Sequence, residues 1–231
     1  MELNLFKIRL EKILDDLSNG IKSAIIYADF NIINYLYENN IQLPPFLIVY
    51  PDSSAVYLAL KYIYSIYDRK IVSTDLQEEI LKAALKSNMS LFFFGDKFQV
   101  LEGLKIKLQV KYPGIQITGL LEGYDFNNID VVQKINSSSP DILFVGLGAS
   151  RQEKWIIDNY KNINAKLIIS VGGWFRYLSG NKIRAPLFIR TIHLEWLVKL
   201  LNEFPVVWKR YIFGIPKFYY RLFANKIILK I

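Results

Sequence analysis

The most informative segment of the sequence is Ile142–Ile157, which reads ILFVGLGASRQEKWII. It opens with a continuous apolar run that ends at Val145, as is typical of a strand buried on both faces of a parallel sheet. Gly146 and Gly148 then allow the backbone to turn tightly and a ligand to approach it closely. The segment is therefore predicted to contain a strand that ends in a glycine turn.

A helix is predicted to begin directly after this turn. Ser150 and Glu153 have the spacing of a capping box, which places the first helical residue at Arg151. A helix N-terminus at the end of a strand attracts anions, because its free N–H groups and its dipole face the ligand. Arg151 adds a full positive charge. On this pattern alone, an ordinary capped turn without a ligand stays open as the alternative.

A second glycine-ended strand is predicted in Ile168–Pro186, which reads IISVGGWFRYLSGNKIRAP. Gly172 and Gly173 follow its apolar run, and Lys182 and Arg184 lie further along. Open α/β sheets bind ligands beside the carboxyl ends of their strands, so the two glycine turns predict one pocket. Arg184 would pair with a diphosphate there. The alternative is that Lys182 and Arg184 are simply solvated.

The rest of the chain repeats the alternation of short apolar runs and longer helical patterns. The predicted strands are Ala24–Tyr27, Phe46–Tyr50, Leu91–Phe94, Ile115–Thr118, Ile142–Val145 and Leu167–Val171. The predicted helices are Asn31–Glu38, Ser53–Tyr67, Leu76–Lys86, Val100–Lys111, Ile129–Asn136 and Arg151–Tyr160. This succession predicts an α/β fold with a Rossmann-like, mostly parallel sheet and helices on both faces. After Gly180 no strand is predicted, and residues 181–231 are expected to form a helical, basic and aromatic appendage to a core of residues 1–180.

Composition excludes several kinds of site. The chain has 231 residues, a net charge of +8, no cysteine and a single histidine, His193. Disulfides, thiolate nucleophiles and zinc–thiolate or multi-histidine centres are therefore excluded. The basic balance suits phosphates, nucleic acid or an anionic membrane without choosing among them. The N-terminus has no signal-peptide pattern, and no apolar run approaches the ~18 residues that a spanning helix needs, so a cytoplasmic protein is expected.

Three segments together resemble the WecG/TagA/CpsF family, glycosyltransferase family 26. The family motif G-x-G-x-P-K-Q-E-x-W-I is similar to Gly146–Ile156. The motif V-G-G-x-F-D-x-x-S-G-x-x-x-R-A-P is similar to Val171–Pro186. The C-terminal motif L-E-W-L-x-R-L-x-x-E-P-x-R-x-W-R-R-Y is similar to Leu194–Tyr211, which reads LEWLVKLLNEFPVVWKRY. The spacing is kept without gaps, so the resemblance is specific over Gly146–Tyr211.

The chain departs from these motifs at several positions. Ser150 and Arg151 stand where the family has Pro and Lys. Arg176 stands where it has Asp, so any role of that carboxylate is expected to be absent. Phe204 and Val206 replace Pro and Arg in the tail, which leaves a few basic positions there: Lys199, Lys209 and Arg210.

The N-terminal half resembles the family more loosely. The family motifs T-x-N and P-D-G correspond to Asp29-Phe30-Asn31 and Pro51-Asp52-Ser53, in which Asn31 and Asp52 match. The family's Thr-Asp-Leu reappears as Thr74-Asp75-Leu76.

The resemblance implies an inverting, metal-independent hexosyl- or N-acetylhexosaminyltransferase. It would move a sugar from a UDP-sugar to a polyprenyl-diphosphate-linked saccharide in bacterial cell-surface polysaccharide or wall-polymer synthesis, with no cofactor beyond the donor. Such a reaction needs a base for the acceptor hydroxyl and stabilisation of the departing diphosphate. Asp52 follows a strand and matches the family's carboxylate, so it is the catalytic candidate. The alternative is that Asp52 caps the next helix, which would favour a low pKa, with Asp29 as the rival carboxylate.

The candidates for substrate binding lie at strand ends, in the glycine turns or in the basic tail. They are Asp29, Asn31, Gly146, Gly148, Arg151, Gln152, Glu153, Gly172, Gly173, Arg184, Lys209 and Arg210. No metal-binding residue is predicted, and His193 is expected to be structural.

The C-terminal segment is expected to hold the protein on the cytoplasmic face of the plasma membrane as a peripheral protein. Trp196–Phe223 interleaves aromatic and basic residues, which suits an anionic membrane surface. Pro205 and Pro216 break it into pieces too short to cross a bilayer. In this reading residues 1–180 are the catalytic core that binds the nucleotide-sugar, and residues 181–231 associate with the membrane. The alternative is that these aromatic residues dock onto the core.

Two other classes of protein stay open. A dehydrogenase or epimerase should show G-x-G-x-x-G before its first helix, whereas the first strand here ends in Tyr27-Ala28-Asp29. A catalytically impaired relative that binds nucleotide-sugar or lipid is kept open by Arg176 and by the altered T-x-N motif. Nucleic acid is not an expected partner, and a homo-oligomer stays open.

Overall fold

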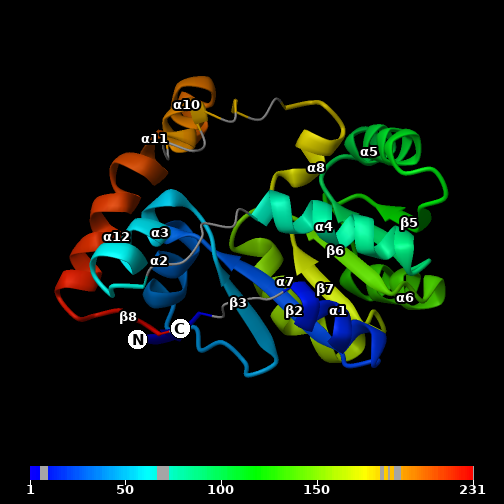
Figure 1. The fold of residues 1–231 in the computed structure, drawn as a ribbon, viewed down its shortest axis with the longest axis horizontal. Coiled ribbons are helices and arrows are strands. Elements are labelled where there is room, and N and C mark those ends of the chain that lie inside the picture. The colour runs from blue at the N-terminus through cyan, green and yellow to red at the C-terminus, as the bar shows by residue number, and fades with distance from the viewer. Residues whose placement is uncertain (6–9, 67–72, 183–184, 187, 190–193, 231) are drawn as a thin grey trace.

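Six strands form the central sheet of the protein (Figure 1). The computed structural model describes residues 1–5, 10–66, 73–182, 185–186, 188–189 and 194–230. The strands of this sheet are β2 (Ser23–Ala28), β3 (Leu47–Pro51), β4 (Ser90–Gly95), β5 (Gln116–Leu121), β6 (Ile142–Gly146) and β7 (Leu167–Ser170). Each pairs in parallel with its neighbours. The six predicted strands are confirmed, and with them the Rossmann-like α/β fold.

Helices cover both faces of the sheet, because each strand sends alternate side chains to opposite sides. In β2, Ala24 and Ile26 belong to one core cluster, and Ile25 belongs to the other. The first face packs against α2 (Phe30–Glu38), α3 (Ser54–Tyr62), α6 (Asn128–Ser138) and α7 (Arg151–Asn159). The second packs against α1 (Leu10–Ser18), α4 (Ser73–Lys86), α5 (Phe98–Lys111) and α8 (Trp174–Leu178). Burial on both faces explains why the strands other than the edge strand β5 appear in the sequence as continuous apolar runs.

The order of the strands, β3-β2-β7-β6-β4-β5, brings distant parts of the sequence together. Ala28 at the end of β2 pairs with Pro51 at the end of β3, and Val145 of β6 pairs with Ser170 of β7. All strands run in the same direction, so the loops that follow β2, β3, β7 and β6 share one edge of the sheet. Ligands of open α/β sheets bind at such an edge.

The C-terminal segment is helical, as predicted, and it packs onto the core. It contains α10 (Glu195–Asn202), α11 (Phe204–Ile212) and α12 (Gly214–Phe223). Helix α12 lies beside α2 (Figure 1), where Arg221 donates to Asn34 Oδ1 at 2.7 Å and to Glu38 Oε1 at 2.8 Å. Phe218 and Leu222 of the same helix are 0% and 3% exposed. Part of this segment therefore belongs to the hydrophobic core.

The prediction that no strand follows Gly180 is wrong. Strand β8 (Ile228–Lys230) pairs in parallel with β1 (Glu2–Asn4), which joins the two ends of the chain beside the main sheet (Figure 1). Strands of three residues are too short to show a hydrophobic period, so neither was visible in the sequence. In the part of the chain that the structure describes, no helix combines the length and the apolar character needed to cross a bilayer.

Candidate functional site

The carboxyl ends of the strands open onto two adjoining cavities. We call the first the glycine cavity; it has a volume of about 240 Å³, and Gly148 and Gly172 of the two glycine turns line it. We call the second the aromatic cavity; it has a volume of about 300 Å³, and Trp196, Tyr211 and Tyr219 line it. Residues shared by both linings mark a junction between the cavities; they include Asp29, Asp52, Ser73, Lys199, Arg210 and Tyr211.

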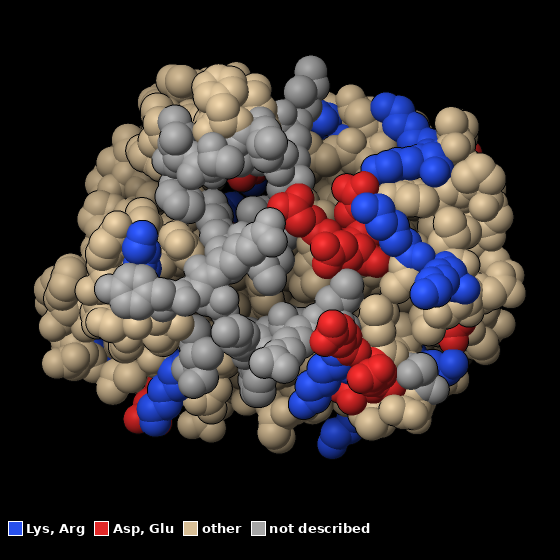
Figure 2. Space-filling view, viewed as in Figure 1, with Lys and Arg blue, Asp and Glu red and all other residues tan. Residues whose placement is uncertain are grey.

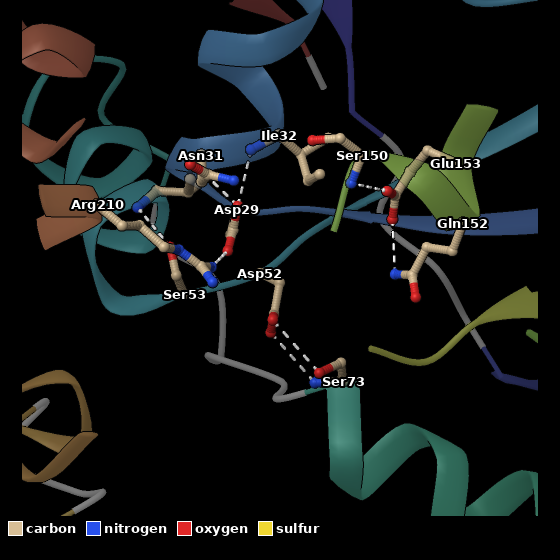
Figure 3. A network of polar contacts seen from close by, with 11 residues as sticks. Asp29, Asn31, Ile32, Asp52, Ser53, Ser73, Ser150, Gln152, Glu153 and Arg210 are labelled. Atoms are coloured by element: carbon tan, nitrogen blue, oxygen red, sulfur yellow. Dashed lines mark hydrogen bonds and ion pairs between the residues drawn. The ribbon is translucent and has the colours of Figure 1, made fainter. Parts of the chain in front are cut away.

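Asp52 lies at this junction, directly after β3 (Figure 3). Its carboxylate accepts hydrogen bonds from the backbone N–H and the hydroxyl of Ser73 at the start of α4, both at 3.3 Å. The N-cap of α3 is Ser53, whose hydroxyl oxygen accepts the N–H of Val56 at 3.5 Å. The alternative that Asp52 caps this helix is therefore wrong.

The environment of Asp52 suits a proton acceptor. Burial raises the pKa of Asp52, the carboxylate of Asp29 adds to the rise, and the hydrogen bond from Ser73 opposes it. The low pKa expected for a helix cap is thus reversed. A carboxylate whose pKa is raised towards neutrality is a stronger base, so Asp52 has the position and the chemistry of a general base.

Asp29, the rival carboxylate, is occupied by structural contacts (Figure 3). It is the N-cap of α2, where it accepts the N–H groups of Asn31 at 2.9 Å and of Ile32 at 2.8 Å. It also forms an ion pair with Arg210 of α11. The structure thereby brings Arg210, a candidate from the tail, to the strand ends. The contacts of Asp29 favour a role in fixing Arg210 rather than in taking a proton.

A chain of hydrogen bonds joins the two glycine turns. The N–H of Ser150 donates to Glu153 Oε2 at 2.6 Å, and Gln152 Nε2 donates to Glu153 Oε1 at 2.7 Å. The N–H of Gly172 then donates to Gln152 Oε1 at 3.0 Å. Figure 3 shows the part of this chain around Glu153. Both oxygens of Glu153 are used by protein donors, so this predicted substrate-binding residue holds the turns in place.

Glu153 is also the most deeply buried carboxylate of the site. It is 2% exposed, and burial raises its pKa to about 7. The hydrogen bonds from Gln152 and Ser150 oppose this rise. Its charge therefore changes near neutral pH, although its bonding pattern is that of an ionised carboxylate.

The glycines of the two turns meet different needs. Gly148 and Gly172 have positive φ values of 87° and 55°, a region that other residues rarely adopt. Gly146 instead allows close packing, because a Cβ atom there would lie 2.6 Å from the ring of Phe175. Gly146 is therefore required for packing against Phe175, whereas Gly148 and Gly172 form part of the cavity wall.

A third cavity adjoins the glycine cavity. We call it the arginine cavity; it has a volume of about 200 Å³, and Gly146, Arg151 and Arg176 are among the residues that line it. The two cavities share a wall of four residues: Gly148, Gly172, Gly173 and Lys182. A ligand long enough to pass this wall would therefore touch both cavities.

Two of the predicted binding residues are not brought to these cavities. The backbone N–H of Asn31 donates to Asp29, and the ammonium group of Lys209 lies 5.6 Å from the ring centre of Trp208. Neither Asn31 nor Lys209 lines the three cavities. Arg184 lies outside the described residues, as does His193.

The structure also adds residues that sequence reasoning did not select. Ser73 contacts Asp52, and its neighbour Thr74 lines both the glycine and the aromatic cavities. Thr74-Asp75-Leu76 was similar to a family motif, which could have pointed to this place. Tyr177 lines the same junction but carried no signal in the sequence. Within the described ranges, no group of three or more acidic or histidine side chains is placed to hold a metal ion.

Comparison with known proteins gives one family. The family described as "Glycosyl transferase WecG/TagA/CpsF family" matches residues 4–230. An N-acetylglucosaminyldiphosphoundecaprenol N-acetyl-beta-D-mannosaminyltransferase of Bacillus subtilis (strain 168) is 34% identical over 171 residues, which are 74% of this chain and 66% of that protein. The protein of the same name from Staphylococcus aureus (strain MRSA252) is 29% identical over 209 residues, which are 87% of this chain and 80% of that protein. The match thus spans slightly less than two thirds of the Bacillus relative.

Among solved structures, a nicotinate phosphoribosyltransferase from Vibrio cholerae aligns with 76% of this chain and 48% of its own. Its TM-score of 0.27 and sequence identity of 12% are too low to support any inference.

Proposed function

Because this chain belongs to the WecG/TagA/CpsF glycosyltransferase family, we propose that it transfers a sugar from a UDP-sugar to a polyprenyl-diphosphate-linked saccharide. The observation that carries this proposal is the position of Asp52 at the junction of the glycine and aromatic cavities. A base at that point can reach a donor sugar held in the glycine cavity and an acceptor hydroxyl that enters from the aromatic cavity.

The proposed reaction inverts the configuration of the transferred sugar. Asp52 takes the proton of the acceptor hydroxyl while the acceptor oxygen attacks the anomeric carbon, and the nucleoside diphosphate leaves from the opposite face. The N-terminus of α7 and the charges of Arg151 and Lys182 stabilise the departing diphosphate. These fixed positive groups supply the charge stabilisation in a scheme that uses no metal.

In this proposal the acceptor binds in the aromatic cavity. Its wall combines aromatic side chains with two cations at the junction, Lys199 and Arg210. Such a wall suits a molecule that joins a saccharide to a diphosphate and a lipid. The two relatives are named for N-acetylglucosaminyldiphosphoundecaprenol, and we infer an acceptor of the same chemical class.

UDP is expected to stabilise the folded protein, whereas NAD is not. The glycine turns and nearby cations suit a diphosphate, and the chain has no dinucleotide-binding fingerprint. At a concentration 100 times its Kd, UDP should raise the free energy of unfolding by about 2.7 kcal/mol, or Tm by roughly 5 to 10 °C. Thermal scans with each nucleotide measure this. A shift with NAD and none with UDP would refute the proposal, and a turnover screen of UDP-sugars against a lipid-diphosphate saccharide would complete the test.

We further propose that the outer side of α10, α11 and α12 contacts a membrane. Several of its large apolar side chains are exposed: Leu201 is 71%, Phe204 51%, Phe213 61% and Phe223 71% exposed. On the face drawn in Figure 2, charged side chains are fewer over α10, α11 and α12 than over α4 and α5. An acceptor with a lipid anchor stays in the bilayer, so an enzyme that docks on the surface would meet it there.

Replacing exposed aromatic residues of the tail should weaken membrane binding. Deletion of the whole segment is a poor test, because Phe218 is fully buried in the core. The full-length double variant Phe213→Ser and Phe223→Ser is expected to bind anionic liposomes at least about 10-fold more weakly in a sedimentation assay. Ile106→Ser and Val110→Ser on α5 form the matched control, since both side chains are also exposed. Equal losses in the two double variants would mean that the tail is not the membrane contact.

A further inference from the structure

Arg176 is held in a fixed orientation beside the glycine turns. Its Nε donates to Asp96 Oδ2 at 2.7 Å, and one terminal nitrogen donates to Asp96 Oδ1 at 3.1 Å. The side chain of Asp96 is 6% exposed, whereas that of Arg176 is 39% exposed. The Asp that the family resemblance would place at position 176 is absent, and Arg176 instead pairs with the carboxylate of Asp96. The buried carboxylate of Asp96 fixes the guanidinium, and Tyr124, which lines the same cavity, also contributes a hydrogen bond to Arg176.

The backbone around Asp96 explains why it can hold this position. Its N–H donates to the carbonyl of Gly146 at 3.1 Å, and its carbonyl accepts the N–H of Gly123 at 2.9 Å. Asp96 is thereby attached to the end of β6, where the first glycine turn begins. Any movement of Arg176 relative to that turn would have to break these contacts or the ion pair.

The arginine cavity has an excess of positive charge. Its charged lining residues are Asp96, Arg151, Arg176 and Lys182, and Asp96 is already paired with Arg176. The N–H of Lys182 donates to the carbonyl of Arg176 at 2.9 Å, so the chain returns to this cavity after α8. The ammonium group of Lys182 also forms an ion pair with Glu203 at 2.7 Å. The arrangement suits a ligand with more than one negative charge.

The position of the arginine cavity relative to Asp52 indicates which part of the nucleotide-sugar would bind in that cavity. Asp52 lines the glycine cavity but not the arginine cavity, and the two cavities meet at the wall formed by the glycine turns. A donor whose sugar lies near Asp52 would pass its diphosphate over this wall towards Arg176. We propose that Arg176 is a phosphate-binding residue of this chain, which Asp96 orients towards the diphosphate of the nucleotide-sugar. This inference rests on the function proposed above.

The experiment compares UDP binding by the wild-type chain and by Arg176→Gln, measured by calorimetry at two salt concentrations. Loss of a guanidinium–phosphate contact should weaken UDP binding about 10- to 100-fold. It should also make the affinity less dependent on salt, which loss of a purely structural contact would not do. Since Arg176→Gln leaves a buried carboxylate unpaired, the double variant Asp96→Asn and Arg176→Gln is measured as well, with its Tm as the check of folding.

The matched control is Lys166→Gln. Lys166 forms an ion pair with Asp141 at 2.7 Å, just before β7 and β6 begin, at the opposite edge of the same sheet. This variant loses the same charge and should bind UDP as the wild type does. Less than about 3-fold weakening in both Arg176 variants, or weakening with unchanged salt dependence, would overturn the inference. A wild-type chain that bound no UDP at all would overturn the proposed donor and this inference together.

Discussion

Asp52→Asn is expected to reduce sugar transfer by about 10²- to 10⁴-fold while leaving the fold and UDP binding nearly intact. Asn cannot accept the proton of the acceptor hydroxyl, but it keeps the size of the side chain and can still accept a hydrogen bond from Ser73. The helix cap is unaffected, because Ser53 caps α3. Steady-state turnover with a lipid-diphosphate acceptor, together with UDP-dependent thermal scans, measures both parts of the prediction.

The pH dependence of transfer gives a second readout for Asp52. Its folded pKa is raised by burial, so the fraction of ionised base increases with pH through a range above that of an exposed aspartate. The kcat/KM of the wild type should rise with pH through that range, whereas the residual kcat/KM of Asp52→Asn should not. If Asp52→Asn retains near wild-type turnover, Asp52 is not the base and Asp29 becomes the next carboxylate to replace.

The stability of the folded protein is expected to fall as the pH rises from about 5 to about 8, and Glu153 is a main cause. Its pKa is about 7 in the folded state, against a usual value of 4.5. Between these values the folded state binds more protons than the unfolded state, so the free energy of unfolding decreases with increasing pH. The difference between the two pKa values corresponds to about 3 kcal/mol in the free energy of unfolding. This contribution to stability is completely lost only above pH 7.

Glu153→Gln isolates this contribution, because a glutamine does not titrate. Denaturant unfolding at several pH values should show a flatter pH dependence for Glu153→Gln than for the wild type. The raised pKa of Asp52 acts in the same direction in both proteins and cancels in the comparison. Asp158→Asn is the control on the same helix, since its carboxylate is 52% exposed and pairs with Lys154. Parallel curves for the wild type and Glu153→Gln would show that Glu153 is ionised across the whole range.

Much of the fold was predictable from local patterns. Five of the six strands, β2, β3, β4, β6 and β7, are largely buried, so their residues appear in the sequence as nearly continuous apolar runs, whereas the edge strand β5 is partly exposed. The helix after β6 was predictable from the spacing of Ser150 and Glu153, because capping depends on contacts within one turn. Strands β1 and β8 were not predictable, since each has three residues and pairs with a strand at the other end of the chain.

The C-terminal segment shows where composition misleads. Its aromatic and basic residues indicated a membrane-associating appendage, yet they divide into two groups in the structure. Phe218 and Arg221 pack against α2 and belong to the core, whereas Phe213 and Phe223 face outward. Helical periodicity does not distinguish a face that packs on the protein from one available to a membrane. Which surface each face meets depends on the path of the chain.

The strands, the glycine turns and the candidate residues at their ends were predictable from the sequence, because these features depend on residues close together in the chain. The sequence could not separate Asp29 from Asp52, since each follows a strand and precedes a helix. Tertiary structure made that distinction. The strand order places both carboxylates at one edge, Arg210 arrives from a distant helix to pair with Asp29, and the start of α4 brings Ser73 to Asp52. The charge and pKa of a side chain depend on every group within a few ångströms, whatever its place in the sequence.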